Sequence, residues 1–198
     1  MSAPDADAAA AASPRHRPPW LEDAERLDVA VYAAIARTPT PSLDRSMRRI
    51  ARAADYSRLN IAAGGVLALA GGSRGRRAAK MGLASVVVTA TIVNAVLKPL
   101  GRRHRPDRVA HTIPDARHVP MPVSSSLPSG HSAAAFAFAT GAGQVLPQAA
   151  APLRLLAAVV AYSRVHTGVH YPGDVVAGAL IGAALAQATT HALDRRLR

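Results

Sequence analysis

Five apolar stretches without Asp, Glu, Lys or Arg restrict the fold of this chain more than any other feature. They are residues 59–73, 81–97, 132–153, 155–163 and 175–193. Roughly 20 helical residues are needed to cross a hydrocarbon core of ~30 Å, so each stretch is marginal alone, and the fourth must borrow turns from its flanks. Pro147 is expected to end the helix of the third stretch. Repetition of such stretches predicts an all-α integral membrane helical bundle with about five apolar helices.

The composition favours packing inside a bilayer over a soluble core. Hydrophobic residues make up 49% of the chain, but aromatic residues only 4%. The apolar material is therefore mainly Ala, Val, Leu and Gly, and small residues allow membrane helices to approach closely. Residues 178–186 (GALIGAALA) are the clearest face of this kind. We expect residues 59–198 to form one membrane-embedded domain.

The N-terminal part of the chain has a different character. Residues 1–20 are Ala, Pro and charged residues without periodic apolar spacing, which predicts a disordered tail. Residues 21–37 and 42–58 have helical periodicity and are separated by TPTP, so residues 21–58 are expected to form amphipathic interfacial helices. Ordinary packing of these helices on the outside of the protein is an equally good interpretation.

The charge balance points to a membrane surface. The net charge is +12, and Lys80 and Lys98 are the only lysines among the 24 basic residues. No reader motif or aromatic-rich basic surface accompanies this charge, so we expect no nucleic-acid partner. Flanking of membrane helices and attraction to anionic lipids explain the charge better. The chain has no cysteine, which excludes disulfides and thiolate catalysis. Its oligomeric state is left open.

Three polar segments lie at the edges of the apolar stretches and carry the candidate chemistry. They are KPLGRRHRP (98–106), PSGH (128–131) and SRVHTGVHYPGD (163–174). Lys98, Arg105 and Arg164 can neutralise the oxygens of a phosphate, which is the main requirement of phosphoryl transfer. Arg102, Arg103 and Arg108 are instead expected to be the solvated positive flank of a membrane helix.

The two other segments supply groups for bond making and proton transfer. Ser129 and Gly130 are expected to open a helix whose N-terminal amides bind an anion, and His131 follows as a general acid for the leaving oxygen. His170 is the expected nucleophile, because Asp174, four residues later, can accept the second ring N–H and orient the imidazole. His166 lies outside this pattern and is expected to be structural.

The set of positions resembles the signature of the type 2 phosphatidic acid phosphatase superfamily, written K-x6-RP, PSGH and SR-x5-H-x3-D. Every fixed position is present, in order, and the resemblance covers residues from about 80 to 193. It implies a phosphatase domain and assigns the same roles: catalysis by His131, His170 and Asp174. It also implies phosphate binding by the remaining matched positions: Lys98, Arg105, Ser129, Gly130 and Arg164.

Crossing parity is consistent with one site at one membrane surface. If residues 81–97 cross once, the loop that follows returns PSGH to the same face, and the next two helices bring back Arg164, His170 and Asp174. Short basic loops at the opposite end favour a cytoplasmic position for that end. The prediction is therefore an exoplasmic active site. The Ala- and Arg-rich composition suggests a bacterial plasma membrane.

The sequence predicts a metal-independent lipid phosphatase that works through a phosphohistidine intermediate without a cofactor. One acid among three cations is hostile to divalent metal binding. Phosphatidic acid, phosphatidylglycerol phosphate, a polyprenyl pyrophosphate and a polyprenyl-linked sugar phosphate all remain possible substrates. Two other classes remain: a vanadate-dependent oxidoreductase resembling haloperoxidases, and a non-enzymatic protein that binds anionic lipids.

Overall fold

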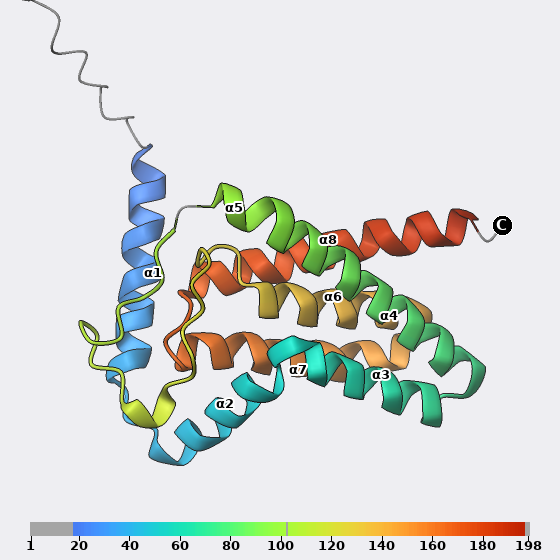
Figure 1. The fold of residues 1–198 in the computed structure, drawn as a ribbon, viewed down its shortest axis with the longest axis horizontal. Coiled ribbons are helices and arrows are strands. Elements are labelled where there is room, and N and C mark those ends of the chain that lie inside the picture. Colours follow the sequence, from blue (N-terminus) through green and yellow to red (C-terminus); the bar gives the residue numbers. More distant parts are fainter. Residues whose placement is uncertain (1–17, 102, 197–198) are drawn as a thin grey trace, which may run out of the picture.

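The structure, a computed structural model, describes residues 18–101 and 103–196, and this part of the chain is helical with no strand. Figure 1 shows its helices. They are α1 (Pro19–Arg37), α2 (Pro41–Ala53), α3 (Arg58–Ala70), α4 (Gly72–Ile92), α5 (Lys98–Leu100), α6 (Gly130–Val145), α7 (Pro147–His166) and α8 (Pro172–Arg196). Two 3₁₀ turns, η1 (Asp55–Ser57) and η3 (Asp115–Arg117), and the π-helical segment η2 (Val93–Leu97) complete the elements. The predicted all-α class is confirmed.

Two helical stretches are long and apolar enough to cross a membrane among the residues described. They are the continuous helix Gly72–Leu100, which comprises α4, η2 and α5, and the α8 stretch Pro172–Arg195. The prediction of about five apolar membrane helices is not confirmed, because α3 and α6 have only 13 and 16 residues. Helices of these lengths fall short of the roughly 20 residues that a bilayer core requires.

Pro147 marks the end of the first helix in this stretch, as predicted, since α6 ends at Val145, and it also begins the next helix. It occupies the first position of α7, where a missing backbone N–H leaves no intrahelical bond unmade. The break therefore falls inside the predicted stretch 132–153, and α7 takes residues from both sides of the short stretch 155–163. The resulting helix has 20 residues.

Helix α6 forms the centre of the bundle and packs against α4, α7 and α8. Small residues make this possible, as the composition predicted. A Cβ atom built on Gly182 of α8 would lie 2.1 Å from the carbonyl oxygen of Ala133, and one on Gly178 would lie 2.5 Å from that of Ser129. These contacts leave no room for any side chain, so α6 and α8 approach at backbone distance.

The ends of α5, α7 and the starts of α6 and α8 lie at one end of the bundle, together with the loop 101–129 (Figure 1). The three polar segments therefore converge, as parity required. Helix α1 runs across this end rather than along the bundle (Figure 1). It is anchored there by Tyr32, which is fully buried and packs edge-on against the rings of His111 and Tyr171.

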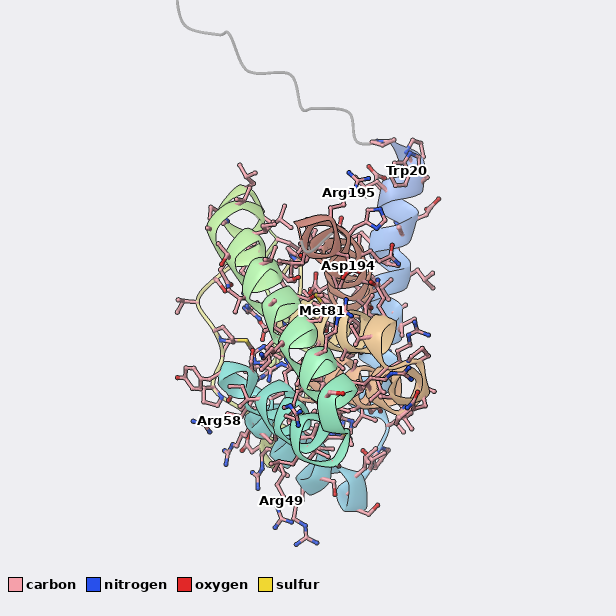
Figure 2. The ribbon with its side chains drawn as sticks, turned by 90° about the vertical axis from the view of Figure 1, so that its right-hand side faces the viewer. Trp20, Arg49, Arg58, Met81, Asp194 and Arg195 are labelled. Carbon is pink, nitrogen blue, oxygen red and sulfur yellow. The ribbon has the colours of Figure 1, made fainter. Side chains whose placement is uncertain are left out.

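The opposite end carries the basic first turns of α4 and the end of α8. Figure 2 looks onto this end, with Met81, Asp194 and Arg195 labelled. Arg77 forms an ion pair with Asp194 at 3.0 Å, which joins α4 to α8. In the same view Arg49 and Arg58 project outward from α2 and the start of α3.

The N-terminal segments differ in their boundaries from the predicted ones. Most of the predicted disordered tail 1–20 lies outside the described residues, and α1 already begins at Pro19. The second predicted helix, 42–58, ends at Ala53, because Tyr56 and Ser57 adopt left-handed backbone angles with φ of 56° and 58°. The turn η1 that contains them leads into α3 beside the predicted site.

Candidate active site

The three predicted phosphate-binding cations gather at the end of the bundle that α1 crosses. Arg105 donates to the carbonyl oxygens of Ser124 and Val169, both at 2.9 Å, which fixes its guanidinium. Lys98 Nζ lies 3.4 Å from the hydroxyl of Ser124. Arg164 is only 2% exposed, and its Nε has no hydrogen-bond partner within the described part of the chain. A buried, unpartnered guanidinium N–H is suited to binding an anion.

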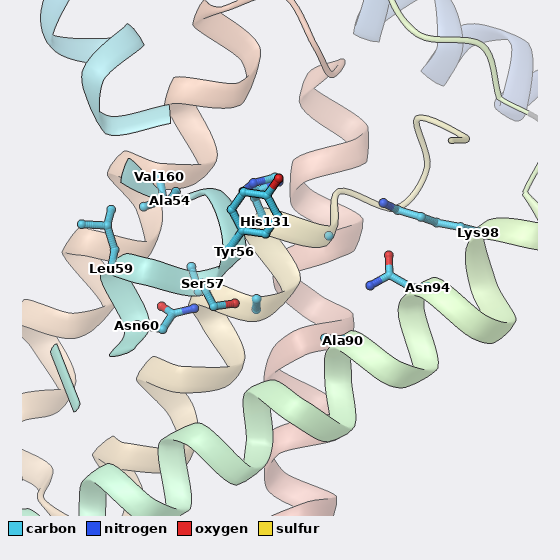
Figure 3. A pocket seen from close by; sticks show the side chains of 13 residues that line it. Ala54, Tyr56, Ser57, Leu59, Asn60, Ala90, Asn94, Lys98, His131 and Val160 are labelled. Atoms are coloured by element: carbon cyan, nitrogen blue, oxygen red, sulfur yellow. The ribbon is translucent and has the colours of Figure 1, made fainter. Parts of the chain in front are cut away.

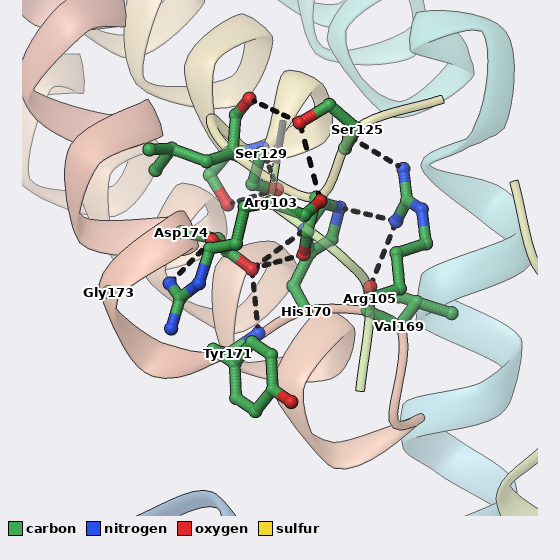
Figure 4. A network of polar contacts seen from close by, with 12 residues as sticks. Arg103, Arg105, Ser125, Ser129, Val169, His170, Tyr171, Gly173 and Asp174 are labelled. Atoms are coloured by element: carbon green, nitrogen blue, oxygen red, sulfur yellow. Dashed lines mark hydrogen bonds and ion pairs between the residues drawn. The ribbon is translucent and has the colours of Figure 1, made fainter. Parts of the chain in front are cut away.

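His170 and Asp174 form the pair that the spacing predicted. His170 Nδ1 lies 3.5 Å from Asp174 Oδ2, and both side chains are at most 2% exposed (Figure 4). The pair is braced by Ser126, whose hydroxyl donates to Asp174 Oδ2 and lies 3.4 Å from His170 Nδ1. The backbone N–H of Tyr171 also donates to this carboxylate, at 2.9 Å. These contacts set the orientation of the imidazole.

Arg105 indicates which ring nitrogen of His170 carries the proton. Its Nη1 lies 3.2 Å from His170 Nε2, and because a guanidinium can only donate, Nε2 accepts. The ring proton is then on Nδ1, facing Asp174, and the Nε2 lone pair faces the cations. Burial lowers the pKa of His170 to about 4, Asp174 opposes this shift, and Arg105 adds to it. His170 is therefore neutral near pH 7, as a nucleophile must be.

The PSGH segment opens α6 at the same place. Ser129 is the N-cap, and its side-chain oxygen accepts hydrogen bonds from the backbone N–H and the hydroxyl of Ser132. The backbone N–H of Ser129 donates to the carbonyl oxygen of Asp174 at 3.0 Å, which ties α6 to the start of α8. Gly130 lies beside Lys98, whose Nζ would be 3.4 Å from an added Cβ atom. The start of α6 thus lies close to Lys98, one of the three predicted phosphate-binding cations.

His131 lies beside Asp55, an acid that the sequence analysis did not assign to the site. Its Nε2 is 3.0 Å from Asp55 Oδ1 of η1, and the same carboxylate oxygen is 3.7 Å from Arg164 Nη1. The eight predicted site residues thus come together at one end of the bundle, linked directly or through Asp55 and Ser124. Asp55 precedes the region of the motifs, and no sequence signal distinguished it from the other acids of the N-terminal segment.

Arg103 is a second residue at the candidate site that the sequence analysis missed. The prediction that it is a solvated flank is wrong: its guanidinium pairs with Asp174 at 2.8 Å and with Asp28 of α1 at 2.5 Å. It also lies over the ring of Tyr171, 4.5 Å from the centroid (Figure 4). The two carboxylates raise the pKa of Arg103 against the opposing effect of burial.

Two neighbours of Arg103 received the same prediction. Arg108 is not a solvated flank either, since it donates to the carbonyl oxygens of Val119 at 2.9 Å and Gly168 at 3.4 Å. Arg102 lies outside the described residues. His166 is away from the site as expected: it is buried and bonds Asp44 at 2.9 Å, and Asp44 pairs with Arg117 at 2.8 Å.

A cavity of about 190 Å³ opens beside His131. Figure 3 shows His131 and Lys98 facing it from opposite sides, with Asn60 and Asn94 between α3 and α4. The remaining lining is mostly small and apolar. It comprises Ala54, Tyr56, Ser57, Leu59, Ala90, Gly130, Ala134, Ala135 and Val160. Lys98, Gly130 and His131 are the predicted site residues that line this cavity, which extends from them between the helices of the bundle.

Within the described residues, His, Asp and Glu side chains form no group of three or more that could hold a metal ion. The site instead combines three cations, two histidines and buried carboxylates. Such a set can bind a phosphoryl group, attack it, and supply a proton to the departing oxygen.

Two known phosphatases are similar to this chain in sequence. The chain is 35% identical over 113 residues to an undecaprenyl-diphosphatase of Sulfolobus acidocaldarius, covering 54% of this chain and 52% of that protein. It is 36% identical over 95 residues to a decaprenylphosphoryl-5-phosphoribose phosphatase of Mycobacterium tuberculosis, covering 46% and 48%. The chain thus spans about half the length of these curated relatives.

Solved structures share the fold over most of their length. The crystal structure of Aquifex aeolicus LpxE superposes with a TM-score of 0.63 at 25% identity, over 82% of this chain and 94% of that one. A transmembrane PAP2-type phosphatidylglycerolphosphate phosphatase from Bacillus subtilis gives 0.64 at 24% identity, over 89% and 88%. The sequence profile of the PAP2 superfamily matches residues 79–198, the part that contains all three polar segments. The resemblance seen in the motifs is therefore confirmed, and the chain belongs to the PAP2 superfamily.

Proposed function

We propose that the protein is a metal-independent phosphatase that hydrolyses a phosphomonoester or pyrophosphate of a membrane lipid through a phosphohistidine on His170. One observation carries the proposal. The Nε2 lone pair of His170 faces Arg105 at 3.2 Å, and Nδ1 is held on the side of Asp174. A neutral imidazole oriented in this way beside three cations is prepared to attack a phosphorus atom.

In the first step, Nε2 of His170 attacks phosphorus and the bond to the leaving oxygen breaks. Lys98, Arg105 and Arg164 neutralise the non-bridging oxygens as charge is redistributed. His131, whose protonation the negative charge of the bound phosphate favours, gives its proton to the leaving oxygen, which departs as an alcohol or as the remaining lipid phosphate. Asp174 stabilises the positive charge that forms on the His170 ring.

In the second step, water attacks the phosphohistidine. Neutral His131 takes the proton of that water, the bond between phosphorus and Nε2 breaks, and its electron pair returns to His170. Inorganic phosphate leaves, and both histidines regain their starting states. The cations do the work that a divalent ion performs in metal-dependent phosphatases, so the cycle needs no metal or other cofactor.

A membrane lipid substrate is favoured by the position of the cavity. It extends from His131 along α3, α4 and α6, and α4 belongs to one of the two helical stretches able to cross a bilayer. The relatives whose names state a substrate act on isoprenoid or glycerophospholipid phosphates. We therefore place the phosphoryl group between the cations and the lipid portion toward α3 and α4.

We also propose that the site faces the exoplasmic side of a bacterial plasma membrane. The end of the bundle opposite the site carries Arg74, Arg76, Arg77 and Lys80 in the first turns of α4. Short basic segments are retained on the cytoplasmic side. Helices α1 and α2 would then lie at the outer interface. A cysteine placed at Ser125 should react with an impermeant maleimide on intact cells, whereas one at Ser73 should not.

The test of the function is phosphate release by the purified protein in detergent. The panel should include phosphatidic acid, phosphatidylglycerol phosphate, undecaprenyl pyrophosphate and a polyprenyl-linked sugar phosphate. We expect release from at least one of them in excess chelator, and none from His170→Ala. Equal release by His170→Ala and the wild type would refute the proposal.

A further inference from the structure

Each of the two histidines of the site has its own carboxylate, and only one of these acids belongs to the three polar segments. His170 has Asp174, whereas Asp55 Oδ1 lies 3.0 Å from Nε2 of His131. Asp55 lies outside residues 79–198, the range matched by the family profile. We propose that Asp55 is a positioning residue that keeps a proton on Nε2 of His131, so that His131 can act as the general acid. This inference rests on the proposed function.

The backbone presents Asp55 to the site through an unusual turn. The two residues that follow it, Tyr56 and Ser57, both have left-handed backbone angles. Such angles disfavour residues other than glycine, and they persist where the surrounding structure determines them, often at functional sites. The turn ends α2 and starts α3 so that the Asp55 carboxylate points at His131, while Tyr56 remains 85% exposed. The turn therefore serves the placement of Asp55 and not the burial of Tyr56.

In the structure without substrate, and with Asp55 in contact, the His131 ring is neutral near pH 7. Burial lowers its pKa to about 3, and Arg164, His170, Lys98 and Arg105 act in the same direction. A neutral imidazole carries a proton on only one ring nitrogen, so the neighbours of the ring decide which nitrogen can donate.

The Asp55 carboxylate contacts the His131 ring, and an ionised carboxylate accepts hydrogen bonds but cannot donate them. It therefore favours the forms of His131 that carry a proton on Nε2, and a bound phosphate adds to the effect. When the proton passes to the leaving oxygen, His131 becomes neutral. In the second step it recovers a proton from the attacking water, and Asp55 keeps its charge throughout.

The first test is a titration of His131 itself. The full-length protein in detergent is labelled at its eight histidines, and the His131 ring signal is assigned by its loss in His131→Gln. An opposite charge at this distance shifts a pKa by about one unit or more. We expect the pKa of His131 to fall by about one unit in Asp55→Asn, to be restored in Asp55→Glu, and to be unchanged in the control Asp115→Asn.

The second test is the dependence on the leaving group. One unit of pKa corresponds to about tenfold less protonated His131 above that pKa. Asp55→Asn should lose about tenfold activity on an alkyl or lipid phosphate. It should lose less than about twofold on p-nitrophenyl phosphate, whose leaving group needs little protonation. Lowering the assay pH by one unit should recover most of the loss.

Two results would overturn the inference. An equal loss on both kinds of ester, with an unmoved His131 titration, would make Asp55 a residue that only shapes the turn. Higher activity together with tighter orthovanadate binding would show that the carboxylate competes with phosphate. If the wild type releases no phosphate from any substrate, the proposed function fails, whereas the titration still decides whether Asp55 controls the proton on His131. Thermal unfolding in detergent verifies that each variant is folded.

Discussion

Replacing Asp174 with asparagine tests how much the His170 pair contributes to the rate. The carboxylate accepts from Ser126 Oγ, the Tyr171 N–H and His170 Nδ1 on Oδ2, and from Arg103 Nη1 on Oδ1. The asparagine amide nitrogen is best tolerated at the position of Oδ1. The amide oxygen then takes the place of Oδ2 and still faces its three donors. His170 keeps its orientation in that arrangement but loses the negative charge beside it.

The magnitude follows from that lost charge. A hydrogen bond involving a charged group contributes about 1.5–3 kcal/mol, which corresponds to roughly 10- to 150-fold in rate. We expect kcat to fall within this range. The comparable substitution in a serine protease costs about 10⁴-fold because the wrong tautomer results. A smaller loss is expected here because Arg105 continues to donate to Nε2 of His170 and keeps the proton on Nδ1.

The matched control is Asp28→Asn. Asp28 pairs with the same Arg103 at 2.5 Å and accepts from the Gly173 N–H at 2.6 Å, but the structure shows no contact between it and His170. Both variants should lower the unfolding temperature in detergent, whereas Asp28→Asn should change kcat by less than about threefold. Steady-state phosphate release on the best lipid substrate gives kcat. Near-wild-type turnover by Asp174→Asn, or equal losses in the two variants, would refute the assigned role.

Three further predictions concern the metal, the pH and the packing. Phosphate release should persist in excess chelator and be inhibited by orthovanadate; restoration of chelator-treated enzyme by Mg²⁺ or Mn²⁺ would contradict the role of the cations. Because burial lowers the pKa of His170 to about 4, the acid limb of kcat/KM should lie well below pH 6.5, and a limb at 6.5 would place His170 in water. Gly182→Ala should destabilise the bundle by about 1–3 kcal/mol in thermal unfolding, since its Cβ would overlap the Ala133 carbonyl, whereas Gly65→Ala, with open space around it, should not.

The sequence predicted the helices better than it predicted their ends and their relation to the membrane. Apolar stretches between arginines are read reliably as helices, because charge is excluded from their interiors. Pro147 was correctly predicted to end a helix, but the start of α7 at the same residue was missed, because a proline is compatible with both the end of one helix and the first turn of the next. The early end of α2 depends on left-handed residues, Tyr56 and Ser57, whose side chains give no sign of it.

Some residues of the candidate site were likewise predicted from the sequence, and others were missed. Lys98, Arg105, His170 and Asp174 were found because their spacing repeats a known pattern. Arg103 was not, since its partner Asp28 is 75 residues away, and the pairing exists only after α1 crosses the end of the bundle. The same holds for Asp55, which reaches His131 from 76 residues away. Local patterns identify the groups that react, whereas the groups that orient them come from tertiary contacts.

The most direct measurement of the central claim is trapping of the phosphoryl enzyme. Purified protein is mixed with a ³²P-labelled lipid phosphate, quenched within milliseconds at alkaline pH, digested, and mapped by mass spectrometry. We predict an acid-labile phosphate on His170 that is absent from His170→Ala and turns over at the rate of phosphate release. Continued turnover by the wild type without label on His170, or with label on another residue, would contradict the mechanism.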